Sequence, residues 1–474
     1  MTRTIVRIPL PARVGAATVL AAIGLSVAML TLGVVPVLAV ALGLVLLPLL
    51  MMRAEAAASV VLVPAVLFEG TAGQLGGAPA FYQSLPVHST PLEVLLVIAL
   101  IAVLISSRQG ARLRWPGPLT GPLVVLILAT VSGMVIGVLN GVDKGLMLTS
   151  ARTLLYLALV PLVVVNVWRT PRQIRHLLTA AAALIILKSA LGIVSLRTGQ
   201  SFQLQGTKFT YYEPVVNFLC MGYILFVLAA VLRRVRLPWW VLAGTVVVLM
   251  SLVLAYRRSF WIAAVLGFVL VLVMASGQTG RPLLLLACAV IGVAVYLTVV
   301  QGVVTEPQAS GPLARRLASL NPNKLTTNPD DRYRLDERRN VLAELRDQPI
   351  TGLGLANPWH ARYPLPAEHV GGHDYVHFAA LWFWLKLGLI GLIGYGALMI
   401  GAVSAARRVW IAHADPLLRS LGLAIGVTIV GLFVVETTAT FTGANPRFTV
   451  IFGAVLGVLA SVHLSLRDAA EGGG

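Results

Sequence analysis

Two histidines stand four residues apart where a polar segment runs into an apolar one, in GGHDYVHFAALWFWLKLGLIG, residues 371 to 391. They are His373 and His377, and tryptophan, phenylalanine and leucine residues follow them directly. Histidine titrates close to neutral pH, so a histidine at the mouth of a helix can take the proton of a hydroxyl group. No third ligand stands at a spacing typical of a metal site. We therefore interpret the pair as the source of one general base and predict no bound metal.

A pair of arginines, Arg257 and Arg258, interrupts another apolar stretch, AYRRSFW. Guanidinium groups stay charged at physiological pH and bind phosphate oxygens through paired hydrogen bonds, so such a pair can hold an anion. The alternative is a shifted helix boundary, or two side chains that extend from the membrane into the aqueous layer.

Four more ionisable residues fall inside apolar segments: Arg152, Lys188, Lys386 and Glu436. Each alone could be a paired structural residue, but all four fall in the outer half of their predicted segments. A transporter is expected to place its polar groups near the middle of the membrane. We interpret the set as a site at the outer membrane surface, where a lipid headgroup lies.

The composition is that of a membrane protein. Of the 474 residues, 58% are hydrophobic and 11% are charged, and the mean hydropathy is +0.88. Long apolar runs recur along the chain, which predicts an all-α, polytopic transmembrane helical bundle of about 12–14 spans. We attribute the net charge of +18 to arginines at cytoplasmic helix ends and expect no nucleic acid binding. Cys220 and Cys288 lie in apolar runs and supply neither a disulfide framework nor a metal set.

The apolar segments indicate spans at residues 14–34, 36–52, 55–68, 91–108, 119–140, 146–167, 174–196, 212–233, 238–256, 259–276, 281–303, 377–407, 416–437 and 444–466. Arginines cluster in every second connection, as in cytoplasmic loops, so both termini are expected inside the cell. Residues 304–376 then form one large, partly helical extracytoplasmic loop. This predicts about eleven spans in residues 1–303, and about three spans with a short cytoplasmic tail in residues 377–474, all in the cytoplasmic membrane.

Within the loop, NPDDRYRLDERRNVLAELRDQP, residues 328–349, has the features of a surface helix. Asn328 can cap this helix, Pro329 suits its first turn and Pro349 ends it. Its predicted apolar face consists of Leu335, Leu342 and Leu345. A glycine-rich turn, ITGLGLANPW, follows and leads the chain back to the membrane.

These groups suit the transfer of a group from a lipid-linked diphosphate. The diphosphate leaves with several negative charges, which arginine side chains stabilise. The attacking hydroxyl loses a proton, which a histidine can accept near neutral pH. Basic residues at the membrane surface and one histidine supply both parts without a metal.

Three motifs in this part of the chain match those of a known family. His377, Leu381 and Gly388 have the family's late spacing, with leucine at the fourth and glycine at the eleventh position after the histidine, and GLIG completes the ending. Arg334 precedes Pro349 by fifteen residues, and the turn PITGLG begins at that proline. RRSFW resembles, less closely, a Ser-Arg-small pattern that opens a span before the large loop. We expect Gly388 to let its helix bend or pack closely.

The chain thus resembles the O-antigen ligase and polysaccharide polymerase superfamily of bacterial membrane glycosyltransferases, by motif over roughly residues 240 to 400. The resemblance implies an all-helical fold and a metal-independent, inverting transfer without a cofactor. The donor would be a glycan on undecaprenyl diphosphate, and the acceptor a hydroxyl of a glycan, lipid or protein. His377 would be the base that activates this hydroxyl. Arg258 and Arg334, together with Arg257, would bind the diphosphate.

Two positions depart from the family pattern. Phe378 follows His377 where Asn, Ser or Gln is usual, and Arg338 stands four residues after Arg334, where an aromatic residue is common. The rival phosphate ligands are Arg332, Arg338, Arg339 and Arg152. His373 is the alternative base, but we favour His377 because only His377 has the glycine spacing.

Two other functions remain open at this point. A metal-dependent polyprenyl-phosphate-sugar transferase typically carries an acidic pair in its first outer loop, whereas residues 70–90 offer only Glu69 at their edge. A transporter or flippase for lipid-linked glycans suits the number of spans, although the chain has no convincing internal repeat.

Overall fold

The computed structural model describes residues 50–70, 77–82, 89–110, 112–204, 207–211, 213–275, 329–365 and 375–471. Its helices are α3 (Ala54–Leu67), α4 (Pro91–Arg108), α5 (Thr120–Leu139), α6 (Lys144–Val167), α7 (Pro171–Thr198), α8 (Pro214–Leu232), α9 (Trp239–Leu254), α10 (Arg258–Ala275), α13 (Pro329–Asp347), α14 (Ala379–Ala412), α15 (Pro416–Val435) and α16 (Pro446–Glu471). Short 3₁₀ turns, η1 and η2, span Pro79–Phe81 and Gly117–Leu119, and β1 (Phe202–Leu204) pairs antiparallel with β2 (Thr207–Phe209).

Nine helices of the described part are long and apolar enough to cross a membrane, and α3 and α9 are shorter apolar helices. The prediction of an all-α, multi-pass membrane protein is therefore confirmed. The predicted spans from 55–68 to 259–276, and from 377–407 to 444–466, each correspond to one helix. The predicted spans 14–34 and 281–303, and nearly all of 36–52, lie outside the described residues, so the total number of spans stays a prediction.

Local sequence signals explain where several helices begin. Thr90 accepts a hydrogen bond from Glu93 N, and the Glu93 carboxylate accepts one from Thr90 N. Thr170 and Gln173 form the same reciprocal cap at α7, and a proline follows each threonine. Such caps satisfy backbone N–H groups that have no partner inside the helix, and proline suits this position because it lacks an N–H.

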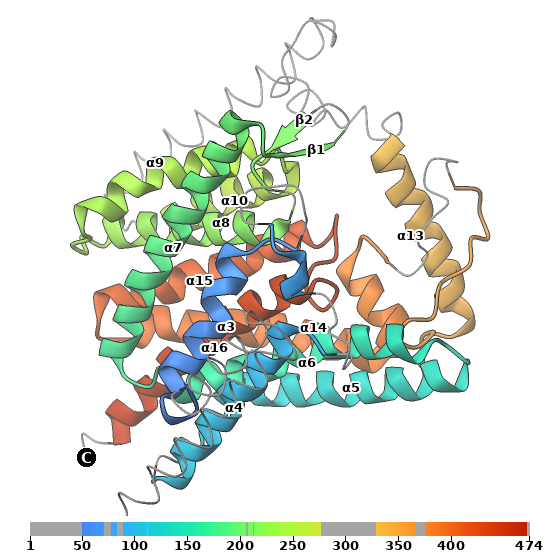
Figure 1. The fold of residues 1–474 in the computed structure, drawn as a ribbon, viewed down its shortest axis with the longest axis horizontal. Helices are drawn as coiled ribbons and strands as arrows, with labels where there is room; N and C mark the ends of the chain where they lie inside the picture. Colours follow the sequence, from blue (N-terminus) through green and yellow to red (C-terminus); the bar gives the residue numbers. More distant parts are fainter. Residues whose placement is uncertain are drawn as a thin grey trace, which may run out of the picture.

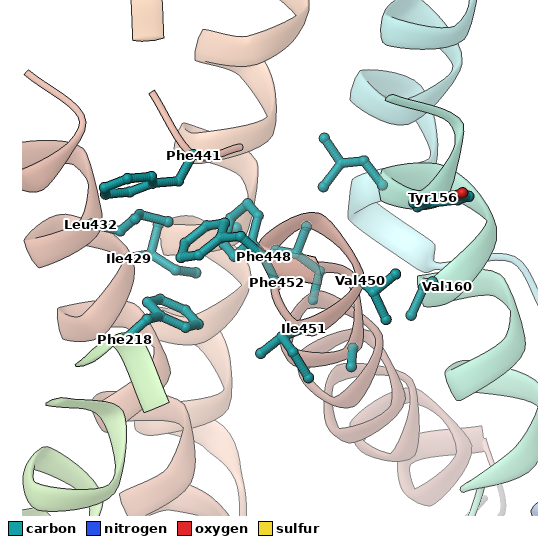
Figure 2. Close-up of a cluster of buried hydrophobic side chains, with 14 of the residues drawn as sticks. Tyr156, Val160, Phe218, Ile429, Leu432, Phe441, Phe448, Val450, Ile451 and Phe452 are labelled. Carbon is teal, nitrogen blue, oxygen red and sulfur yellow. The ribbon is translucent and has the colours of Figure 1, made fainter. Parts of the chain in front are cut away.

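Small residues allow the closest helix contacts. Gly453 and Gly457 stand one turn apart on α16 and face α6, where a Cβ on each would lie 3.1 Å and 2.5 Å from the Cβ atoms of Val160 and Val164. Figure 2 shows the aromatic packing beside this contact, where Phe218 of α8 meets Phe448 and Phe452 of α16. In a membrane the lipid tails are as apolar as the side chains, so the hydrophobic effect does not drive helices together. Close van der Waals packing of this kind stabilises helix pairs instead.

Four charged side chains form a buried group, which we call the ion cluster: Glu69, Lys188, Glu213 and Arg447. Nη1 of Arg447 lies 2.7 Å from Oε1 of Glu69 and 2.8 Å from Oε2 of Glu213. Nζ of Lys188 lies 3.0 Å from the same Oε1 of Glu69. Lys188 also donates to Leu67 O, and Arg447 donates to Ala65 O and Val66 O. The two cations thus satisfy the last carbonyl groups of α3, which have no partner within that helix.

Helix α14 is bent at Gly388, whose φ and ψ are 70° and −170°. The glycine-rich turn after α13 enters this bend: Leu389 N donates to Ile350 O, and Leu353 N donates to Leu385 O. A side chain at Gly352 or Gly388 would collide with backbone carbonyls of the facing segment. The expectation that Gly388 permits a bend and close packing is confirmed. The glycine-rich turn and the Gly388 motif, which are distant in the sequence, pack directly against each other.

The same turn also contacts α5. Leu355 N donates to Gly133 O, and Asn140 Nδ2 donates to Leu353 O. The turn therefore lies between α5 and α14 and fixes where α13 leaves the bundle. Figure 1 shows α13 at one side of the bundle, opposite the C-terminus.

Residues 329–347 form the predicted surface helix, but its predicted apolar face is partly wrong. Leu345 is buried, whereas Leu335 is 45% exposed. The inner face instead buries Glu337 and Asn340, together with Val341. These polar groups are tolerated because they have partners: Asn340 Oδ1 accepts hydrogen bonds from the backbone N–H groups of residues 362 and 363.

Candidate active site

A cavity of about 280 Å³ lies where three segments meet: the start of α13, the entry to α14 and the end of α15. Its lining residues are Arg334, Leu335, Glu337, Arg338, Val376, His377, Phe378, Leu381, Thr437 and Thr438. The motif residues His377 and Arg334, 43 positions apart in the sequence, thus share one cavity (377 − 334 = 43). We call it the arginine–histidine cavity.

Glu337 holds His377 through two contacts. Nδ1 of His377 lies 3.0 Å from Glu337 Oε1, and the backbone N–H of His377 donates to Oε2 over 2.8 Å. The Glu337 side chain is 2% exposed and that of His377 is 29% exposed. With an ionised carboxylate at Nδ1, this nitrogen carries the hydrogen and Nε2 is the basic nitrogen.

Two tyrosines pack edge-on against the His377 ring. The ring centroids of Tyr375 and Tyr333 lie 4.9 Å and 5.8 Å from that of His377. Burial raises the pKa of Tyr333 to about 12, and the charge of Glu337 and its hydrogen bond with Tyr333 act in the same direction. Tyr333 therefore stays neutral at physiological pH and donates a hydrogen bond to Glu337.

The entry to α14 is fixed to the segment after α15. The Tyr375 hydroxyl donates to Thr440 O over 2.6 Å, and the Thr440 hydroxyl donates to Val376 O over 2.5 Å. Ala379 N also donates to Glu436 O. His377 consequently stands on a backbone that is held on both sides, which suits a residue that must meet a substrate in one orientation.

Arg334 and Arg338 stand one helical turn apart and both line the cavity. The guanidinium carbon of Arg338 lies 5.6 Å from the centroid of the Phe378 ring. The two departures from the family pattern, Arg338 and Phe378, are therefore in contact with each other, as a cation over an aromatic face.

Residues 222–396 match the family model of O-antigen ligase. Over these residues the chain is similar to the O-antigen ligase family. The matched region contains α9, α10, α13, the glycine-rich turn and α14 as far as eight residues beyond Gly388 (396 − 388 = 8). The resemblance to the O-antigen ligase and polymerase superfamily is confirmed over these residues, and both sides of the His377–Glu337 contact belong to them. Among curated proteins, no significant match was found.

Arg257 and Arg258 belong to the matched region but lie outside the cavity lining. The Arg257 guanidinium carbon lies 6.0 Å from the centroid of Phe441, and its charge acts on the Tyr375 hydroxyl, whose pKa is raised by burial. Arg258 is the first residue of α10.

The rival candidates take different positions. Arg332 and Arg339 are both exposed. Nε of Arg332 lies 3.8 Å from Oδ2 of Asp336, and Nη1 of Arg339 lies 3.6 Å from Oδ1 of the same residue. Arg152 lies 3.1 Å from Glu93, which also accepts a hydrogen bond from Tyr156. None of these three arginines lines the arginine–histidine cavity. His373 lies outside the described residues.

The set of outer ionisable residues does not gather in one site. Lys188 belongs to the ion cluster, and Lys386 donates to Asn357 O over 2.5 Å. Glu436 accepts hydrogen bonds from the Tyr395 hydroxyl over 2.5 Å and from Thr442 N over 2.7 Å. The charge pattern of the sequence predicts a depth in the membrane for each side chain, but it does not identify the partner that the side chain contacts.

Glu337 is the site residue that sequence reasoning missed. Its spacing carries a signal, because Arg334, Glu337 and Arg338 stand at positions i, i+3 and i+4 and share one helix face. In the part of the chain that the structure describes, no three His, Cys, Asp or Glu side chains are arranged so that they could hold a metal ion.

Proposed function

We propose that the protein is a membrane glycosyltransferase that moves a glycan from an undecaprenyl-diphosphate-linked donor to an acceptor hydroxyl at the outer face of the cytoplasmic membrane. One observation supports the proposal: His377, whose Nδ1 contacts the Glu337 carboxylate, lines one cavity with two arginines, and all of these residues lie in the region that matches the O-antigen ligase family. The acceptor is a glycan, a lipid or a protein.

In this reaction Nε2 of His377 takes the proton of the acceptor hydroxyl. The hydroxyl oxygen forms a bond to the anomeric carbon of the donor glycan, while the bond from that carbon to the phosphate oxygen breaks. The electron pair of the broken bond leaves with undecaprenyl diphosphate. Attack from the side opposite the leaving group inverts the anomeric carbon. His377 later returns the proton to solvent.

The leaving diphosphate needs positive charge that is already in place. Arg334 and Arg338 line the cavity beside His377, and guanidinium groups bind phosphate oxygens in a bidentate manner. Fixed cations stabilise charge that develops in the transition state without reorganisation at that moment. The proposal assigns this task to the arginines, with Arg257 and Arg258 as further diphosphate contacts, and requires no metal or cofactor.

The proposed topology follows from the same chemistry. The divisions are the bundle of residues 1–303, the extracytoplasmic loop 304–376 and the final spans in 377–474, with both termini in the cytoplasm. Helix α13 and the entry to α14 then lie at the outer surface, where a lipid-linked glycan presents its diphosphate. Labelling of single cysteines introduced at positions 332 and 339 from outside intact cells tests this arrangement.

Glycan profiling of a gene-deletion strain tests the activity. The strain is complemented with the wild type, Arg334→Ala, His377→Ala or the matched control Arg339→Ala, which removes an exposed arginine from the same helix. We expect only the wild type and Arg339→Ala to restore the product glycan, and the donor to accumulate with the other two at equal protein levels. Full restoration by both Arg334→Ala and His377→Ala would contradict the proposal, whereas a flippase should tolerate His377→Ala.

A further inference from the structure

We infer that Glu337 is a positioning residue that holds His377 in its basic tautomer and stabilises the imidazolium that forms when His377 takes the acceptor proton. The inference rests on the proposed function of His377 as the base. The sequence spacing only places Glu337 on the same helix face as Arg334 and Arg338, and its role follows from the contacts of α13 with the entry to α14.

Three donors converge on the Glu337 carboxylate. They are the backbone N–H of His377, the Nδ1–H of the same residue and the Tyr333 hydroxyl. The carboxylate is almost completely buried, so its charge acts through protein rather than through water. A negative charge held against Nδ1 stabilises the positive form of the ring, which is the form that exists after proton transfer.

The charges around His377 come from each element that packs against it. Helix α13 supplies Arg334 and Arg338 beside Glu337, and all three line the cavity with His377. Tyr375 contacts the ring from its own segment, and the charges of Arg257 and Glu436 reach the Tyr375 hydroxyl. Two arginines disfavour the imidazolium, so a buried carboxylate in direct contact with the ring is the group that can offset them.

The same helix carries a second Glu–His contact that serves as a control. Glu344 Oε1 lies 3.2 Å from Nδ1 of His360, but the His360 side chain is 77% exposed and Arg362 also pairs with Glu344. Neither Glu344 nor His360 lines the arginine–histidine cavity. Replacing Glu344 therefore removes the same charge from α13 without touching His377.

The experiment measures glycan transfer against pH. Purified protein is added to membranes of the deletion strain, which supply the accumulated lipid-linked glycan and the native acceptor, and product is followed by gel between pH 5 and 9 (about two units on either side of neutral). The variants are Glu337→Gln, Glu337→Asp, the control Glu344→Gln and His377→Ala. Thermal unfolding of each variant reports its folding.

We expect Glu337→Gln to lower the transfer rate about tenfold to a hundredfold at neutral pH. The acidic limb of its profile should move to lower pH by about one unit, because loss of the negative charge makes protonation of the ring less favourable. Glu337→Asp keeps the charge but draws it back by one methylene group. It should keep the wild-type acidic limb with a rate lowered about tenfold at an unchanged melting temperature.

The outcomes separate the two proposals. If Glu337→Gln has the rate and acidic limb of Glu344→Gln while His377→Ala is inactive, Glu337 is only a structural residue and the proposed function stands. If His377→Ala transfers at the wild-type rate, the proposed function itself fails. Should Glu337→Gln not fold, Glu337→Asp decides: a wild-type rate in that variant overturns the inference.

Discussion

Among the described residues, two groups of charged side chains differ in balance and exposure: the ion cluster and the arginine–histidine cavity. The ion cluster joins two cations and two anions, Lys188, Arg447, Glu69 and Glu213, all of them buried. The cavity is lined by two arginines and one glutamate, beside a histidine that is 29% exposed. Three members of the ion cluster stand at helix ends: Glu69 after α3, Glu213 before α8 and Arg447 near the start of α16.

We interpret this difference as one between charge that stabilises the fold and charge that is available to bind a ligand. In an apolar environment a charge costs several kcal/mol unless a partner offsets it, and the ion cluster meets this requirement internally. The cavity lining carries more positive than negative side chains and leaves space between them, which suits an anionic ligand that enters from outside. Ionisable residues in predicted spans therefore cannot all be assigned to one site.

The largest effect is expected from breaking the ion cluster. Arg447→Ala leaves the buried carboxylates of Glu69 and Glu213 without their cation and removes two hydrogen bonds from the end of α3. We expect a loss of about 3–5 kcal/mol in the free energy of unfolding, seen as a lower melting temperature in detergent. Arg467→Ala, an exposed change on the same helix, is the control. Equal melting temperatures for the two variants would show that the cluster does not stabilise the fold.

A smaller effect is expected at the joint that connects the bundle to the cavity. Gly388→Ala places a side chain against the Ile350 and Thr351 carbonyls at a positive φ, so α13 must shift. We expect a loss of about 2–4 kcal/mol in stability and a larger fall in transfer than the lost folded protein explains. Gly396→Ala on the same helix meets nothing within 4 Å and should change neither quantity. If Gly388→Ala kept the wild-type rate of glycan transfer, the bend of α14 at Gly388 would not be required for function.

The cavity arginines should alter binding and leave stability unchanged. Arg334→Ala removes a guanidinium group from the cavity, and hydrogen bonds between charged groups contribute about 1.5–3 kcal/mol. We therefore expect undecaprenyl diphosphate to bind more weakly by about tenfold to a hundredfold in a fluorescence titration. Arg332→Ala and Arg339→Ala, on the exposed face of α13, should bind it as the wild type does. Weakening of equal size in all three variants would indicate general attraction to the helix surface instead.

The smallest effect is expected at the contact between the two departures from the family pattern. Phe378→Leu removes the aromatic face beneath Arg338, a contact worth about 0.5–1 kcal/mol at an exposed position. We expect the affinity for undecaprenyl diphosphate to fall about twofold to fivefold. Phe433→Leu, at an exposed position on α15, is the control. A loss equal to that of Arg334→Ala would mean that Phe378 itself contacts the ligand.

The sequence predicted those features that depend on neighbouring residues. Apolar length and threonine or proline caps at positions such as Thr90 and Thr170 determine where helices begin and end, and these signals are local. The spacing of the His377 motif also placed the histidine at the entry of a helix. The similarity to the O-antigen ligase family over residues 222–396 could be predicted because the motifs occur in a fixed order.

Features that depend on distant partners could not be predicted. Glu337 is buried only because α13 docks on the entry to α14, so its sequence neighbourhood resembles that of any charged surface helix. Lys188 and Glu436 were grouped with the site because of their predicted depth in the membrane, yet each contacts a partner from another helix or loop. The turn at Gly352 likewise packs against the bend at Gly388. No local sequence pattern predicts this contact between distant segments.

The transfer rate per folded molecule of His377→Ala, measured beside His360→Ala, tests the central claim most directly. His360 also contacts a glutamate of α13, and it lies outside the cavity. The account predicts that His377→Ala lowers the rate about 10²- to 10⁴-fold at an unchanged melting temperature, while His360→Ala transfers as the wild type does. Equal rates for the two variants would contradict the assignment of the arginine–histidine cavity as the active site.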